Sequence, residues 1–385
     1  MSTIRVCPAC ARRTWLLERL AGHLDPVRGR IDELLALEDL PLVQAVGGER
    51  RDAIARELAG HDPAELGRRV ERVERVERAE LDAICRCDPA YPEALRDLPA
   101  PPAVLYVAGG LRRLAALRGP PCVALVGSRR PSAYGTEIAR TLAADLACAG
   151  LPVVSGMALG IDAAAHRGAL DAHLSAGAGA SRPGPDAPGP TVAVLPAGPD
   201  IAYPARHRRL LTHIRQRGVV LSELGPGVAP RRWMFPARNR IIAALAQLTV
   251  IVQARERSGA LITAGWAARL GRLRGAVPGP ATAPLSAGPH QLLREGAALI
   301  ASVQDVLDAL YGAGAVRAPP LRQSELEPAL AALLEAVADG EEGASAFARA
   351  GLNGECGLAA LARLELAGLV RRGPGGRYVA RSGRR

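Results

Sequence analysis

The sequence lacks lysine altogether, so arginine contributes all 49 of its basic residues. Aromatic residues make up only 3% of the chain, while glycine and proline number 42 and 31. These biases run through the whole chain and are typical of GC-rich codon usage. The abundance of arginine therefore does not by itself indicate a function, and the places where charge is concentrated carry more information.

Long apolar runs are also missing. No stretch of about 20 apolar residues occurs, which is the length that a membrane-spanning helix needs. The N-terminus carries charge early, at Arg5, and lacks the apolar core of a signal peptide. Hydrophobic residues make up 49% of the 385 residues, so we expect a cytoplasmic, globular protein of two or three domains with no membrane partner.

The motifs of several enzyme classes are absent. There is no G-x-G-x-x-G fingerprint, no P-loop lysine and no G-x-S-x-G elbow, so dinucleotide binding, NTP hydrolysis and serine-hydrolase chemistry have no support. We therefore expect no catalytic residue and no cofactor. One alternative stays open: Glu223, a lone carboxylate near a predicted strand end, is either the base of a nucleotide-cleaving enzyme or the partner of a nearby arginine.

Cysteine usage argues against a disulfide framework. The number of cysteines is odd, and thiols are expected to stay reduced in the cytoplasm. Two close pairs, C-x-x-C and C-x-C, would together supply four zinc ligands. They lie far apart in the sequence, so buried or incidental thiols are the preferred interpretation and no metal is expected. The seven residues are Cys7, Cys10, Cys85, Cys87, Cys122, Cys148 and Cys356.

The chain divides into three segments of different pattern. Residues 1–85 show apolar residues at three- and four-residue spacing, which predicts a small helical domain of the SAM or helix-hairpin-helix kind. Residues 86–315 alternate short β-branched runs with amphipathic helices. This alternation predicts an α/β fold, an extended Rossmann-like, doubly wound and mainly parallel sheet. Residues 320–385 predict three helices and a hairpin, the order of a winged-helix-like domain.

Net charge separates these segments. Residues 111–310 carry +12, whereas residues 1–110 carry −3 and residues 311–385 carry +2. The concentration of positive charge in the middle indicates a polyanionic partner there, with a merely solubilising surface as the alternative. The weak charge after residue 311 disfavours a transcription factor led by the winged helix. Residues 173–190, rich in small residues and proline, are interpreted as a surface insertion.

Five predicted strand ends in the middle segment open into loops of small, hydroxylated or basic residues. Glycine lets the backbone approach a ligand, arginine makes bidentate contacts to phosphate, and helix starts offer unpaired N–H groups. The loops supply cations and donors without paired catalytic groups, so we expect them to hold phosphates unchanged. The candidate binding residues are Gly127, Ser128, Arg129, Ser132, Ser155, Gly156, Gly160, Arg206, Arg208, Arg238, Asn239, Arg240, Ser258 and Gly259.

Residues beside the loops have two interpretations each. Asp162 is expected to cap a helix and to form a hydrogen-bonded structural pair with His166, four residues later, whereas a catalytic or metal-binding role is the alternative. Aromatic residues near the loops are candidates for stacking on bases, with core packing as the alternative. They are Tyr134, Tyr203, Trp233, Phe235 and Trp266.

Taken together, these motifs resemble the DNA-processing protein A family, also called DprA or Smf. They occur in the order and spacing of that family from about Pro89 to Leu310, and several motifs in a fixed order make the resemblance specific. They are GSRRPSAYG, SGMALGIDAAAHRGAL, LPAGPDIAYPARHRRLL, LSELGPG, FPARNRIIAALA, SGALITAGWAARLGR and AVPG.

The resemblance implies a Rossmann-like domain that binds single-stranded DNA. It also implies a homodimer that loads the RecA recombinase onto incoming DNA during natural transformation. Residue by residue, it points to Arg129 and Arg206 as DNA contacts and to the Arg238-Asn239-Arg240 stretch as a further one.

Overall fold

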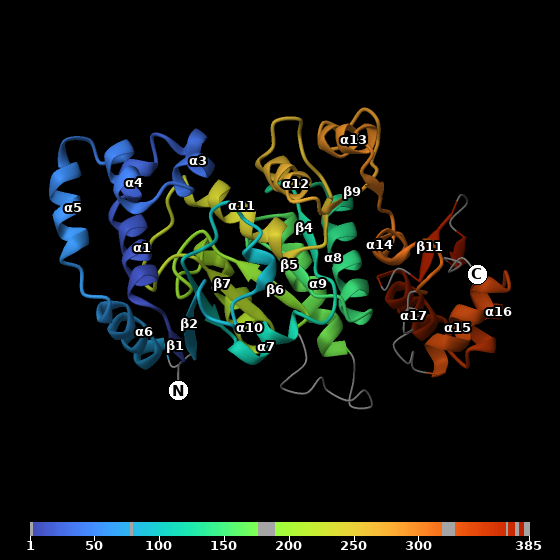
Figure 1. Cartoon of the computed structure of the whole chain (residues 1–385). Helices are drawn as coiled ribbons and strands as arrows, with labels where there is room; N and C mark the ends of the chain where they lie inside the picture. Colours follow the sequence, from blue (N-terminus) through green and yellow to red (C-terminus); the bar gives the residue numbers. More distant parts are fainter. Residues whose placement is uncertain are drawn as a thin grey trace. The chain divides into compact units, whose positions relative to one another are not determined.

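A computed structural model of the chain (Figure 1) describes residues 3–77, 80–175, 189–317, 328–366, 369–373 and 377–380. The chain forms two compact units, Met1–Ala318 and Pro319–Arg385. Most of the insertion interpreted at 173–190 lies outside the described residues. Among the helices that the structure describes, none combines the length and the apolar character that crossing a bilayer requires.

The first unit is built on one ten-stranded sheet in the order β1-β2-β3-β7-β6-β5-β4-β8-β9-β10. Strands β4 to β10 are mutually parallel, and β3 runs antiparallel to both of its neighbours. The predicted α/β fold with a mainly parallel sheet is therefore confirmed. The strands are β1 (Ile4–Arg5), β2 (Leu81–Cys85), β3 (Val104–Ala108), β4 (Val123–Val126), β5 (Val153–Ser155), β6 (Thr191–Val194), β7 (Val219–Ser222), β8 (Leu248–Ile251), β9 (Leu273–Ala276) and β10 (Ala298–Leu299).

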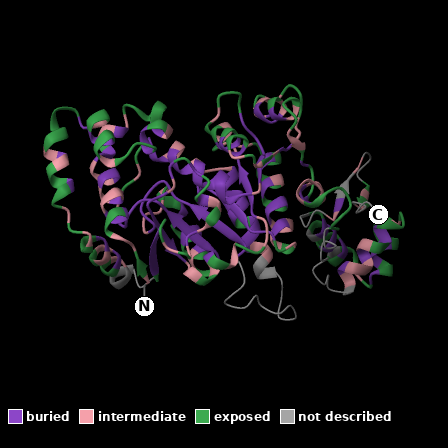
Figure 2. Ribbon diagram, in the orientation of Figure 1, coloured by how far each residue is buried: buried purple, intermediate pink, exposed green. Residues whose placement is uncertain are grey.

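Helices cover both faces of this sheet, because its strands are apolar on both sides and appear as the buried centre of the unit in Figure 2. One face packs on α7, α11, α12 and α13, and the other on α6, α8, α9, α10 and α14. The helices after β3 are α7 (Leu111–Ala116), α8 (Ala133–Cys148), α9 (Ile161–Ser175), α10 (Arg208–Arg217), α11 (Met234–Leu245), α12 (Gly259–Arg269), α13 (Ala287–Arg294) and α14 (Val303–Tyr311), with the 3₁₀ turns η3 (Glu93–Leu95) and η4 (Ala205–His207).

The winding of the sheet reverses between β4 and β8. From β4 the chain moves through β5 and β6 to β7 in one direction, and from β8 it moves through β9 to β10 in the other. Ligands of such sheets bind beyond the carboxyl ends of the strands at the point of reversal. The loops after β4 and β8 therefore frame the expected binding position.

The N-terminal helices pack on this α/β body. Their apolar core includes Trp233, Met234 and Ala237 at the start of α11, and β1 and β2 belong to the large sheet. The structure thus joins segments that the sequence analysis divided at residue 85. These helices are α1 (Pro8–Arg19), α2 (Ala21–Leu24), α3 (Ile31–Leu35), α4 (Asp39–Val46), α5 (Arg51–Ala59) and α6 (Ala64–Glu77), with the 3₁₀ turns η1 (Arg28–Arg30) and η2 (Gly48–Arg50).

The second unit has a small core of its own, centred on Leu333 and Leu364. Its elements follow the predicted order of three helices and an antiparallel strand pair, while its assignment as a winged helix stays a prediction. The expected hairpin turn spans residues 373–376, of which 374–376 lie outside the described residues. The elements are α15 (Pro328–Ala338), α16 (Gly343–Arg349), α17 (Gly354–Leu366), β11 (Val370–Arg372) and β12 (Tyr378–Ala380).

Candidate nucleic-acid interface

A cavity of about 260 Å³ lies at the reversal point, between the loop after β4 and the first turns of α9, α11 and α12. A second cavity of about 60 Å³ shares Arg129, Ala158 and Phe235 with the first and extends to the segment before η4. We call the two together the cleft. The sequence-predicted residues that line it are Gly127, Arg129, Gly156, Arg238, Asn239, Ser258 and Gly259.

Arg129 is the exposed cation of the cleft. Its guanidinium carbon lies 5.1 Å from the centre of the Phe235 ring, and the Phe235 ring meets the exposed Tyr203 ring edge-on at 5.4 Å. Within the described part of the chain, Arg129 has no ion-pair or hydrogen-bond partner. The ring supports the cation without neutralising its charge, so the guanidinium is available to an anion.

The loop after β4 is held by Gln253, a buried residue that follows β8. Its Oε1 accepts a hydrogen bond from the Ser132 backbone N–H at 3.0 Å, and its Nε2 donates to the Ser132 hydroxyl at 2.8 Å. Ser132 also caps α8 by accepting from the Gly135 N–H. The hydroxyl predicted as a ligand contact therefore orders the loop. Sequence reasoning missed Gln253, whose only signal is a polar side chain directly after a buried strand.

Ser128 and Gly160 also belong to the frame of the cleft. The Ser128 hydroxyl accepts from the Arg130 N–H at 3.1 Å, and its carbonyl accepts from the Ile161 N–H at 3.2 Å. Gly160 has a φ of +78°, and a Cβ there would overlap the Ser128 carbonyl oxygen. Glycine is therefore required for the loop after β4 to approach α9 this closely.

Arg238 lies buried at the floor of the cleft. Its guanidinium donates to the carbonyl oxygens of Gly156 and Val194 and lies 3.9 Å from the Asp162 carboxylate. Burial lowers the pKa of Arg238 to about 10, which leaves it charged at neutral pH. A Cβ on Gly156 would overlap this guanidinium, so the glycine makes room for it. Arg238 adds positive potential to the cleft while its donors hold the ends of β5 and β6 together.

The pair predicted between Asp162 and His166 is not formed in the described structure. The His166 Nδ1 lies 2.7 Å from the Thr191 hydroxyl, and burial lowers the His166 pKa to about 3, so the ring is neutral. Asp162 lines the cleft and accepts from the Ala158 N–H at 3.3 Å; burial raises its pKa, against the lowering effect of Arg238. The Ser155 hydroxyl, also buried, donates to the Leu125 carbonyl and links β5 to β4. These contacts stabilise the framework.

The start of α12 supplies neutral donors to the cleft. Ser258 caps this helix by accepting from the Ala260 N–H at 3.3 Å, and Gly259 forms part of the cleft wall. The first N–H groups of a helix have no partner within it and favour anions. Asn239 donates to the Gly259 carbonyl at 3.4 Å from the facing helix. The N-terminus of α12 and the loop after β4 thus present donors and a cation to the same space.

Arg240 lies outside the cleft. It is 1% exposed, and its two terminal nitrogens donate to the two carboxylate oxygens of Glu223 at 2.9 and 2.6 Å. It also donates to the carbonyls of Ala100 and Ala237. The structure therefore gives Arg240 a buried structural contact in place of the predicted DNA contact, and of the two roles left open for Glu223 it shows the arginine pair.

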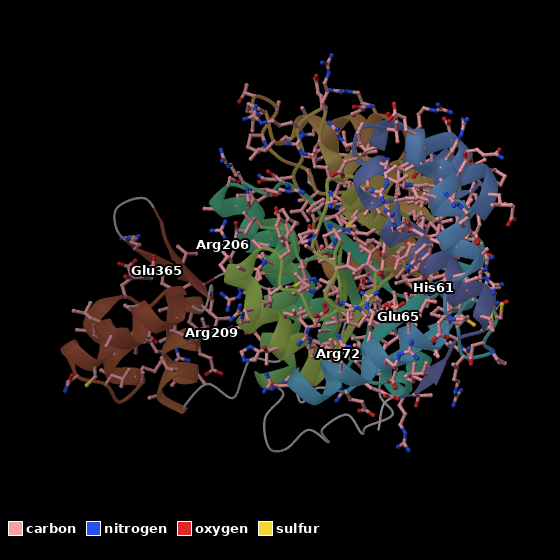
Figure 3. All side chains as sticks on the ribbon, turned by 90° about the vertical axis from the view of Figure 1, so that its left-hand side faces the viewer. His61, Glu65, Arg72, Arg206, Arg209 and Glu365 are labelled. Carbon is pink, nitrogen blue, oxygen red and sulfur yellow. The ribbon has the colours of Figure 1, made fainter. Side chains whose placement is uncertain are left out.

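Three exposed arginines continue from the cleft along the start of α10. Arg206 lies in η4, directly after the Tyr203-Pro204 step that lines the cleft, and Arg208 and Arg209 begin α10. None of their three guanidinium groups has a hydrogen-bond or ion-pair partner among the described residues. Figure 3 labels Arg206 and Arg209 on this side of the unit. They extend the unpaired positive charge of Arg129 beyond the cleft.

The aromatic candidates separate by burial. Tyr203 and Phe235 line the cleft, and Tyr134 is exposed with its hydroxyl donating to the Pro278 carbonyl. Trp233 is buried and donates to the Ala21 carbonyl at 3.1 Å, and Trp266 is buried in the sheet core. Stacking on bases is thus open to the first group, while the two tryptophans serve packing.

With this geometry in view, comparison with protein families gives a match over residues 82–311 to the family of DNA recombination-mediator protein A. The chain belongs to this family. The matched segment contains the parallel strands β4 to β10, the cleft and the basic start of α10, so the family assignment covers the whole candidate interface.

Individual relatives agree with the family. A putative DNA processing protein DprA of Mycobacterium tuberculosis is 49% identical over 189 residues, which are 49% of this chain and 45% of that protein. The chain thus spans about half the length of this curated relative. The X-ray structure of DNA processing protein A from Streptococcus pneumoniae is 31% identical, covers 79% of this chain and 98% of its own, and has a TM-score of 0.59.

A second solved structure concerns nucleic-acid binding directly. It is described as showing a unique single-stranded DNA binding mode of DNA processing protein A from Helicobacter pylori. The two chains are 29% identical, the match covers 60% of this chain and 96% of the other, and the TM-score is 0.51. This family member therefore shares the fold of the present chain.

Proposed function

We propose that the chain binds single-stranded DNA along a path from the cleft to the start of α10. The observation that carries this proposal is the unpaired Arg129, which lies over Phe235 beside Tyr203 in the cleft. A guanidinium holds a phosphate, and an adjacent aromatic face is suited to an unstacked base, which a single strand offers and a duplex does not. The described binding mode of the Helicobacter pylori relative supports the same ligand.

The path has room for several phosphates. Arg206, Arg208 and Arg209 are exposed and unpaired within the described structure, so a strand leaving Arg129 meets further cations in sequence. The N-terminus of α12 adds backbone donors at the other side of the cleft. Contacts between arginines and phosphates should supply most of the affinity of this surface for DNA. The surface offers few groups that contact base edges, so its affinity should depend little on the DNA sequence.

We expect affinity for single-stranded DNA to fall steeply with salt. If three to five arginines contact phosphates, the slope of log K against log salt should be about −2 to −3.5. Fluorescence anisotropy of a labelled oligonucleotide at several salt concentrations measures this slope. A duplex of the same sequence serves as the control and should bind more weakly. Absence of binding near physiological salt, or an affinity independent of salt, would contradict the proposal.

We propose further that the protein holds DNA without chemical change. Glu223, the base that a nucleotide-cleaving alternative requires, lies outside the cleft with both carboxylate oxygens engaged by Arg240. Asp162, the carboxylate within the cleft, faces the buried Arg238. Neither is placed as a free base, which favours a binding role.

The finer proposal is that the protein acts in the cytoplasm as a homodimer and loads the RecA recombinase onto incoming DNA in natural transformation. It rests on membership of a family described as recombination mediators. We expect the protein to accelerate RecA filament formation on oligonucleotides covered by single-strand-binding protein. A filament growth rate that the protein leaves unchanged would refute this part while leaving DNA binding intact.

A further inference from the structure

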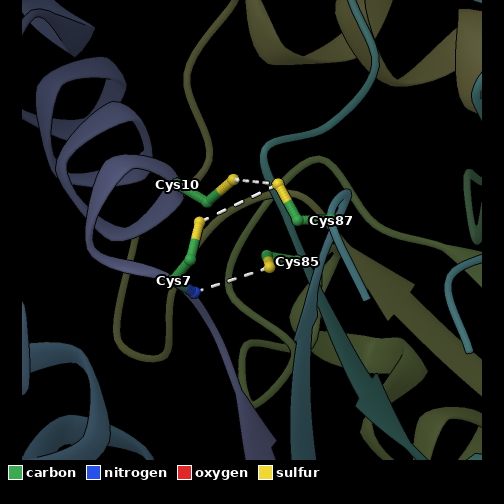
Figure 4. Close-up of side chains that lie close together, drawn as sticks. All are labelled: Cys7, Cys10, Cys85 and Cys87. Carbon is green, nitrogen blue, oxygen red and sulfur yellow. Dashed lines mark hydrogen bonds between the residues drawn. The ribbon is translucent and has the colours of Figure 1, made fainter. Parts of the chain in front are cut away.

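Four cysteines from the two ends of the N-terminal region meet at one point of the first unit. Figure 4 shows Cys7 and Cys10 from the start of α1 facing Cys85 and Cys87 from the end of β2. Their sulfur atoms all lie within 4.8 Å of one another. The sequence favoured buried or incidental thiols because the two pairs lie far apart in the chain, whereas the structure places the pairs side by side.

The strand pairing explains why they meet. Strands β1 and β2 are parallel, with Ile4 opposite Ala83 and Arg5 opposite Ile84, so their carboxyl ends lie side by side at the same end of the sheet. Cys7 and Cys85 therefore lie at neighbouring strand ends. Cys10 follows in the first turn of α1, and Cys87 lies two residues beyond Cys85. The backbone thus brings a C-x-x-C pair to a C-x-C pair without any distortion of the helix.

The sulfur positions fit a single tetrahedral metal ion. Cys87 Sγ lies 3.9 Å from the sulfur atoms of both Cys7 and Cys10. Four thiolates about 2.3 Å from a zinc ion lie about 3.8 Å from one another, whereas a disulfide requires sulfur atoms about 2.05 Å apart. None of these four cysteines is joined in a disulfide. The two distances from Cys87 thus match those between ligands of one ion, and no two of the four sulfur atoms are more than 4.8 Å apart.

We propose that Cys7, Cys10, Cys85 and Cys87 bind one zinc ion in a structural site. Four soft sulfur ligands with no position left for water favour a closed tetrahedral zinc centre, and the four thiol protons are released on binding. The occupied site carries a formal charge of −2. The Cys7 N–H donates to Cys85 Sγ at 3.5 Å, which adds one backbone hydrogen bond to a ligand sulfur.

The site would close the chain from residue 7 to residue 85 around all six N-terminal helices. Its ligands anchor the start of α1 to the end of β2, and therefore fix the helical region to the edge of the large sheet. None of the four cysteines lines the cleft. Zinc should thus support the stability of the N-terminal region without contributing to DNA binding.

Metal content of the purified full chain tests the proposal directly. Inductively coupled plasma mass spectrometry should find one zinc per chain in the unmodified protein and none in C87S. Because Cys87 is exposed, this substitution leaves the apolar core unchanged. The matched control is C356S, an exposed cysteine of the second unit, which should keep its zinc. The C87S protein should have a lower Tm and an unchanged affinity for single-stranded DNA.

A second measurement does not depend on any variant. The unmodified protein, stripped of metal by a chelator under reducing conditions, should take up one Co²⁺ and show the intense absorption of a tetrahedral cobalt thiolate. Zinc should then displace the cobalt. A protein that contains no zinc and takes up neither metal, or a mass spectrum showing a native disulfide among these cysteines, would overturn the proposal. Stoichiometric iron in place of zinc would overturn the choice of metal.

Discussion

Replacing Arg240 with alanine is expected to lower the free energy of unfolding by about 3–5 kcal/mol, because the substitution leaves the buried Glu223 carboxylate without its partner. Glu223 is 8% exposed, and both of its oxygens accept hydrogen bonds from Arg240. The carbonyl oxygens of Ala100 and Ala237 also lose a donor. Denaturant titration, followed by circular dichroism, measures the change.

The double variant E223L/R240M is the control for this prediction. Removing both charges and keeping apolar bulk should recover most of the lost stability, since a buried ion pair is often replaceable by packed hydrophobic residues. Under conditions where the R240A protein is folded, its affinity for single-stranded DNA should equal that of the unmodified chain. A stable R240A protein that has lost DNA binding would instead support the DNA contact that the sequence predicted.

The burial of Arg240 shows what a motif leaves open. Sequence reasoning placed Arg238, Asn239 and Arg240 at the opening of a helix near the binding site, and the structure puts them in α11. Two residues apart on a helix are rotated by about 200° from each other, so Arg238 and Arg240 face different surroundings. Arg238 reaches the cleft and Arg240 reaches the core beside Glu223. The residue types indicated an anion site, but only the packing of α11 determines which of its side chains face the cleft.

The sheet was predictable because its signal is local. Strands such as Val123–Val126 and Leu248–Ile251 are continuous apolar runs, and a parallel sheet covered on both faces requires this pattern. The loops at their carboxyl ends follow from the same rule, which is why several predicted residues line one cleft. The order of the strands could not be predicted from these local runs. The contact between Gln253 and Ser132 could not be predicted either, because it joins two loops that are distant in the sequence.

The cysteine cluster was not predictable for a related reason. It depends on β1, a strand of only two residues that carries no periodicity, pairing in parallel with β2. In the described part of the chain, six α-helices separate the two strands. The sequence around each cysteine pair shows the spacing of two ligands, but it does not show that the two pairs come together in the fold. The same long-range packing buries Trp233 against the N-terminal helices.

Replacing Arg129 with alanine is expected to weaken binding of single-stranded DNA by about 10- to 100-fold, the effect of losing one charge-assisted contact to a phosphate. Arg129 is exposed and has no hydrogen-bond or ion-pair partner in the part of the chain that is described, so stability should change by no more than about 0.5 kcal/mol. The salt slope should become less negative by about 0.7. Anisotropy titrations of the two proteins at matched salt concentrations give both quantities.

Two further variants distinguish a positioned contact from general positive charge. R129K keeps the charge but loses the planar fork and its contact with the Phe235 ring, so its affinity should fall between those of R129A and the unmodified chain. Arg130 is equally a free exposed arginine in the same loop but does not line the cleft, so R130A should cost much less than R129A. Equal losses in R129A and R130A would mean that DNA responds to the charge of the loop as a whole. In that case the cleft built by Phe235 and α12 would not be where the strand is held.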